Sequence, residues 1–171
     1  MKKFVFILST IALFSFAQNA IAQKKSIVEI ASGNSDFSTL VTALKAADLV
    51  GALQGDGPFT VFAPTNDAFA KIDSKALGNL LKPENKKALA NILTYHVISG
   101  NIPAKGVASA LKKGGGKTQL TMLNGTGLKV MQKDGKIWLK DKNGNYSQIV
   151  TTDIMASNGV VHVIDTVVMP E

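Results

Sequence analysis

The sequence NGVVHVIDTVVMP, residues 158–170, is an almost unbroken apolar run near the C-terminus. Many of its residues are β-branched, a class that favours extended strands. Successive side chains of a strand point to opposite faces. Val160 and Val161 therefore lie on different faces, and the residues that follow on each face are largely apolar. Two apolar faces are typical of a strand that is covered on both sides. The run therefore predicts a strand inside a hydrophobic core.

His162 and Asp165 are polar residues within this run, and we expect both to be structural. A neutral imidazole is satisfied inside a core by two hydrogen bonds, and buried polar groups usually find such partners. A catalytic pair is disfavoured because a separation of three positions puts the two side chains on opposite faces of a strand. A metal site is disfavoured as well, because the chain has no ligand spacing such as HExxH.

The rest of the second half predicts an antiparallel meander. From residue 117 onward, short alternating segments are separated by Asn-Gly or Asp-Gly pairs at residues 124–125, 134–135, 143–144 and 158–159. These pairs are the preferred two-residue hairpin turns, because such turns need positive φ angles.

The first half predicts helices around one strand. Apolar residues recur at helical spacing over residues 35–49, with Ser35 or Asp36 as the N-cap. Further helices are expected over residues 68–72, from Pro83 toward Tyr95, and over residues 103–111. Residues 59–64, FTVFAP, predict a buried strand. Together the two halves predict an α+β domain.

The N-terminus predicts export. Lys2 and Lys3 precede an apolar stretch and the small residues Ala20 and Ala22, which is the order of a signal peptide over residues 1–22. We expect one domain over residues 23–171, secreted or periplasmic, with no transmembrane segment after cleavage. Cysteine is absent, which excludes disulfides and thiol chemistry.

The charge favours acidic partners other than nucleic acid. Lysine and arginine together number 19 against 12 acidic residues, and all 19 are lysines. Lysine lacks the planar fork with which arginine grips phosphate. The stretch KKGGGKT, residues 112–118, lacks the first glycine of a phosphate loop, so no cofactor is predicted.

The hairpin KVMQKDGKIWLK, residues 129–140, is a candidate binding surface. A two-residue turn at residues 134–135 would place six side chains on one face in facing pairs, with Val130 and Leu139 on the other. The six are Lys129 and Lys140, Met131 and Trp138, and Lys133 and Lys136. We expect this face to contact acidic glycans. The alternative is that the lysines protect the sheet from aggregation while another segment covers Trp138.

Three segments resemble a known family. GPFTVFAPTNDAFAKI (residues 57–72), LTYHVISG (93–100) and NGVVHVIDTVVMP (158–170) are similar, in order and spacing, to the conserved boxes of the fasciclin, or FAS1, domain. The resemblance implies a compact β-sandwich or wedge of mostly antiparallel strands with several helices. It also implies an adhesion role with no catalytic mechanism, and it singles out Tyr95 and His96 as binding candidates. The alternative is that Tyr95 packs as an aromatic anchor and His96 hydrogen-bonds the neighbouring backbone. Thr65, Asn66 and Asp67 in the first box are expected to cap a helix.

We therefore expect a monomeric binding module that contacts an extracellular or envelope protein or an acidic polysaccharide at the cell surface or matrix. A hydrolase of an extracellular ester or glycan is one alternative, and it requires an open pocket containing His96 or His162. A self-assembling structural envelope protein is another, and it requires an exposed apolar patch.

Overall fold

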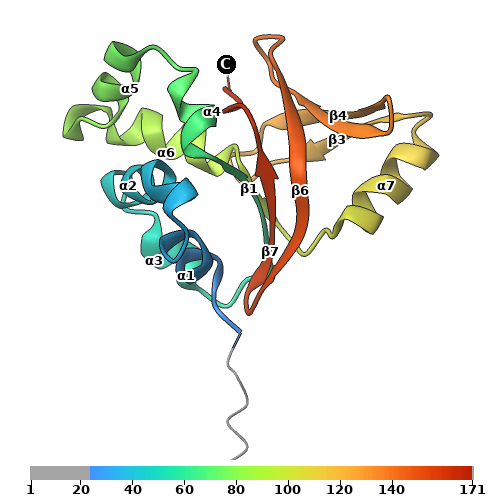
Figure 1. Cartoon of the computed structure of the whole chain (residues 1–171), viewed down its shortest axis with the longest axis horizontal. Helices are drawn as coiled ribbons and strands as arrows, with labels where there is room; N and C mark the ends of the chain where they lie inside the picture. The colour runs from blue at the N-terminus through green and yellow to red at the C-terminus, as the bar shows by residue number, and fades with distance from the viewer. Residues whose placement is uncertain (1–23, 171) are drawn as a thin grey trace, which may run out of the picture.

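In the computed structural model, which describes residues 24–170, seven strands form one bent sheet in the order β2-β1-β7-β6-β5-β4-β3 (Figure 1). β1 and β7 pair in parallel, and every other neighbouring pair is antiparallel. The predicted meander is therefore confirmed and runs from β3 to β7. The strands are β1 (Phe59–Pro64), β2 (Val97–Ser99), β3 (Lys117–Thr121), β4 (Gly127–Lys133), β5 (Lys136–Lys140), β6 (Tyr146–Ala156) and β7 (Gly159–Ile164).

The sheet bends at β6, which belongs to both of its halves. The first residues of β6 pair with β5, and those from Ile149 onward pair with β7, with register shifts at Ile149/Thr151 and at Thr151/Ile154. Such irregularities bend a strand and increase its twist. At the open side, the backbone N–H of Leu123 donates to the carbonyl of Val97, 2.7 Å away, and joins the β3–β4 connection to β2. The sheet is thus nearly closed into a wedge.

Most helices cover the outer face of β1 and β7, whereas α7 lies apart from them beside β3 and β4 (Figure 1). The helices are α1 (Ile27–Ser32), α2 (Ser38–Ala46), α3 (Val50–Gln54), α4 (Asn66–Ala70), α5 (Ser74–Leu80), α6 (Lys86–Thr94) and α7 (Ala104–Lys113), with short 3₁₀ turns at Ser35–Phe37 and Pro83–Asn85. The continuous helix expected over residues 35–49 is wrong in its limits. Asn34 caps a 3₁₀ turn before α2, and Asp48 has a φ of 59°, which ends the helical conformation before α3.

Two hydrophobic cores lie on the two faces of the β1–β7 layer. Val61 and Val161 point toward the helices and pack with residues such as Leu40. Phe62 and Ile164 point the other way, into the wedge, where they belong to the same core as Leu111 of α7. All six residues of β7 are buried, which confirms the prediction of a strand covered on both faces.

The predicted signal peptide, residues 1–22, lies outside the described residues. Among residues 24–170, no helix is both long enough and apolar enough to cross a membrane.

Candidate ligand-binding face

The β4–β5 hairpin forms with the register predicted from its turn. Asp134 and Gly135 have φ angles of 53° and 73°, the left-handed conformations that a tight hairpin turn requires. Lys129 lies opposite Lys140, Met131 opposite Trp138, and Lys133 opposite Lys136. All six side chains therefore share one face of the hairpin.

The other face of the hairpin is core. Val130 is 1% exposed and Leu139 is fully buried, and both pack inside the wedge. Because side chains alternate along a strand, the six paired residues point outward. Trp138 and Met131 are half-buried on this outer side, so the tryptophan is partly covered and partly accessible.

Neighbouring strands extend this outer face in regular rows. Lys117 of β3 continues the row of Met131 and Trp138, and Gln148 of β6 completes it. The next row holds Gln119, Lys129, Lys140 and Tyr146. We call this surface the lysine face, and it consists of Lys117, Gln119, Lys129, Met131, Lys133, Lys136, Trp138, Lys140, Tyr146 and Gln148.

The charge of the lysine face is not neutralised from within. Across residues 24–170 the ion pairs are Lys71 with Asp165 and Lys86 with Asp48, so they leave all five lysines of the face unpaired. The segment 105–142 carries nine lysines and two aspartates, hence a net charge of +7. The ammonium of Lys140 lies 5.1 Å from the ring centre of Tyr146, a cation–π contact that orients it.

Two depressions mark the lysine face. One, of about 420 Å³, is bordered by Lys117, Gln119, Lys129, Met131 and Lys140. The second, of about 260 Å³, is bordered by Lys129 and Lys140 again and by the β5–β6 turn, including Lys142. Both are open surface features, suited to contact with a large ligand.

Tyr95 and His96, proposed as binding residues, are inside the protein. Tyr95 is fully buried and His96 is 2% exposed, so the partial exposure that a binding role requires is wrong, and the alternative of two packed structural residues is confirmed. The chain passes here from α6 to β2, between the helices and the sheet, where both layers cover it. Nδ1 of His96 donates to the carbonyl of Ile92 at 2.8 Å, and Nε2 accepts from the N–H of Val168 at 3.2 Å.

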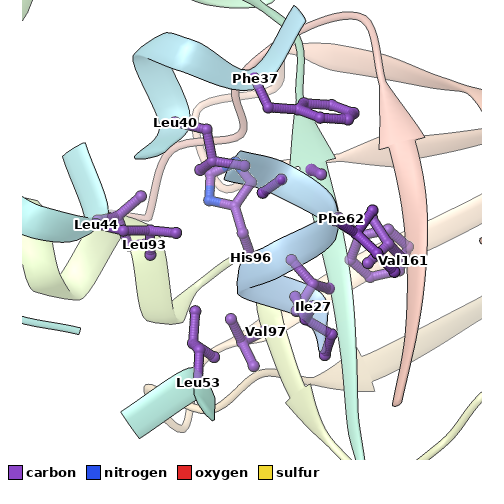
Figure 2. Close-up of a pocket in the computed structure, with 14 residues that line it drawn as sticks. Ile27, Phe37, Leu40, Leu44, Leu53, Phe62, Leu93, His96, Val97 and Val161 are labelled. Carbon is purple, nitrogen blue, oxygen red and sulfur yellow. The ribbon is translucent and has the colours of Figure 1, made fainter. Parts of the chain in front are cut away.

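His96 also borders a small apolar cavity. Figure 2 shows its imidazole among apolar side chains such as Leu40 and Leu93. Burial lowers the pKa of His96 to about 4, although the hydrogen bond to Ile92 opposes this shift. The cavity has a volume of about 20 Å³, and both ring nitrogens already have partners, so it is a packing gap in the core.

His162 is a satisfied core residue, as its position in β7 predicted. It is 1% exposed, Nε2 donates to the carbonyl of Ile102 at 2.9 Å, and Nδ1 accepts from the N–H of Asp153 at 3.3 Å. Neither histidine lies in an open pocket, which the hydrolase alternative requires.

The remaining predicted motif residues hold segments together. Thr65 caps α4 by accepting from the N–H of Ala68, so this helix starts two residues before its predicted position. Asn66 accepts from the N–H of Thr39 and joins α4 to α2, while Asp67 is exposed in the first turn of α4. Asp165 accepts from the N–H of Gln148 at 2.8 Å and lies near Lys71.

Sequence reasoning missed four residues of the lysine face, Lys117, Gln119, Tyr146 and Gln148, and also Lys142 beside it. The first four could have been found by extending the pairing of the β4–β5 hairpin to the strands on either side. Lys142 lies in a turn, and no periodicity predicts where a turn side chain points.

Comparison with known proteins gives one family. The family model of the fasciclin domain matches residues 35–170. The chain is 48% identical to Protein sll1483 of Synechocystis over 90% of its length and 78% of that relative. It is 35% identical to pig transforming growth factor-beta-induced protein ig-h3 over 92% of its length, but over only 21% of that longer protein.

A solved structure has the same fold. It is a FAS1 domain pair from the insect cell adhesion molecule fasciclin I, with a TM-score of 0.73 and 16% sequence identity. The match covers 84% of this chain and 50% of the solved chain. Because the family model spans most of the described residues and the fold agrees with it, this chain belongs to the fasciclin domain family.

Proposed function

We propose that the protein is an exported adhesion module that binds acidic polysaccharide of a cell envelope or matrix through the lysine face. Export is supported by the sequence of residues 1–22, and adhesion by the membership of a cell adhesion molecule in the same family.

One observation carries the proposal: unpaired lysines face one another across the hairpin on both sides of the half-buried pair Met131 and Trp138. Like charges that face each other destabilise a sheet, so a ligand that neutralises them gains favourable energy. A row of cations beside a half-buried indole ring matches a sugar polymer, since the accessible part of the ring packs on the sugar and the ammonium groups meet its acidic groups.

Trp138 makes the test direct, because it is the only tryptophan of the chain. The purified protein is titrated with polygalacturonate and with neutral dextran while tryptophan fluorescence is recorded. We expect a change with polygalacturonate that weakens as salt is raised, because salt screens exposed charges.

Matched variants locate the binding surface. Lys129→Gln combined with Lys140→Gln should weaken binding, as should Trp138→Ala measured by sedimentation with the polymer. The control is Lys45→Gln combined with Lys87→Gln, which removes the same charge from exposed helical positions. Equal losses in both double variants would show a non-specific attraction and reject the lysine face. Absence of binding to any acidic polymer would reject the proposed function.

A further inference from the structure

The two depressions of the lysine face adjoin each other, and together they cross the strands. They share Lys129 and Lys140: the first extends from these lysines to Lys117 on the edge strand β3, and the second extends to Lys142 in the β5–β6 turn. We call this the cross-strand groove. Its line of cations runs across β3, β4 and β5 and not along any one of them.

We propose that the ligand is a linear polyanion that lies along the cross-strand groove and contacts Lys117, Lys129, Lys140 and Lys142 with acidic groups of successive units. The inference rests on the proposed function and adds the direction and minimum length of the ligand. Adjacent strands are about 4.8 Å apart, so the path from β3 to β5 alone is about 10 Å long. A single sugar or a small anion cannot reach both ends.

The chemistry of the groove favours a chain of separate charges over one concentrated anion. Lysine ammonium groups are flexible point charges without a bidentate geometry. They suit carboxylate or sulfate groups that recur along a polymer. Gln119 and the apolar Met131 lie between the cations and offer contacts to the uncharged parts of each unit.

The end of the groove is held in place by a buried carboxylate. Asp141 lies between Lys140 and Lys142 and is 4% exposed. Its oxygens accept from the N–H and the Nδ2 of Asn145, at 2.8 and 3.1 Å, and from the N–H of Met169 at 3.1 Å. These bonds tie the β5–β6 turn to the C-terminal segment. The carboxylate of Asp141 is therefore engaged with Asn145 and Met169 and forms no ion pair with Lys140 or Lys142.

The test uses galacturonate oligomers from dimer to octamer, with tryptophan fluorescence and calorimetry as readouts. We expect affinity to rise with length until the oligomer spans Lys117 to Lys142 and then to level off. Lys117→Gln and Lys142→Gln should each weaken octamer binding about threefold, the effect of one exposed charge pair.

The matched control is Lys87→Gln, which removes an exposed lysine of α6, outside the lysine face. It should change octamer affinity little. Equal affinity for dimer and octamer, or an equal loss in Lys87→Gln, would overturn the cross-strand groove while leaving polymer binding intact. Binding to vesicles of anionic phospholipid but to no oligomer would assign the lysines to a membrane surface instead. If no acidic polymer binds at all, the proposed function itself fails.

Discussion

Nε2 of His96 accepts a hydrogen bond from the backbone N–H of Val168, which lies 72 positions later in the chain and 3.2 Å away. Nδ1 of the same ring donates to Ile92 in α6, so one imidazole connects the end of a helix to the C-terminal segment. Only the neutral ring can do both. His162 uses the opposite tautomer, because its Nε2 donates and its Nδ1 accepts.

The first prediction concerns acid stability. The pKa of His96 is lowered from 6.5 to about 4 by burial, so between these values the unfolded chain binds the proton more readily than the folded one. The contribution of His96 to stability is complete above about pH 6.5 and falls as the pH drops toward 4, by at most about 3 kcal/mol. Urea unfolding at a series of pH values measures it.

His96→Gln is the companion variant for this measurement. Glutamine does not titrate, so the variant should be less stable at neutral pH but should lose the part of the pH dependence between 4 and 6.5 that belongs to His96. An unchanged slope in the variant would assign the acid sensitivity to another group.

The second prediction concerns Asn158, which is 8% exposed. Its side chain accepts from the N–H of Ile27 and donates to the carbonyls of Leu53 and Gly55. Asn158→Ala leaves the N–H of Ile27 and the carbonyl of Leu53 buried without this partner and should lower the free energy of unfolding by about 2–3 kcal/mol. Asn101→Ala, at an exposed position, should change it by less than about 0.5 kcal/mol. Similar effects of the two variants in urea would contradict the role of Asn158.

The third prediction compares two glycines. A Cβ at Gly159 would overlap the carbonyl oxygen of Phe59 in the neighbouring strand, so Gly159→Ala should destabilise the protein by about 3 kcal/mol. Gly78 lies within α5 and has no atom within 4 Å of such a Cβ, so Gly78→Ala should stabilise by roughly 0.5–1 kcal/mol. Thermal melts of the two variants should shift in opposite directions.

The fourth prediction separates stability from binding on the lysine face. Lys129→Glu places a carboxylate opposite Lys140, which should stabilise the hairpin by roughly 0.2–1 kcal/mol while weakening polyanion binding. Adding Lys140→Glu restores a like-charged pair, so the gain in stability should disappear and binding should weaken further. A double variant as stable as Lys129→Glu alone would show that the facing lysines do not repel each other.

Local chemistry made much of the fold predictable. The turn at Asp134 and Gly135 fixed the register of β4 and β5, and the two apolar faces of β7 indicated its central place. The limits of the helices were less predictable, because α1 covers only six residues and its best signal is the capping box of Ser26 and Glu29. The parallel pairing of β1 with β7 joins segments about a hundred positions apart, and no local pattern encodes it.

The candidate site was predictable only where the hairpin determines it. Trp138 and the four lysines of β4 and β5 were placed correctly on one face. The sequence left both a binding role and a packed structural role open for Tyr95 and His96, because their burial depends on two layers that meet over the junction. The contribution of Lys117 depends likewise on which strand pairs with β4.

Because β6 belongs to both halves of the bent sheet, neither half can lose its structure while the other keeps its own. The protein should therefore melt in a single cooperative transition, although its two cores have no residues in common. Protonation of His96 occurs in the layer next to the helices, but it lowers the stability of the whole fold, including the lysine face. A polymer held there stabilises the folded state as a whole, so its binding should also protect the His96 junction against acid.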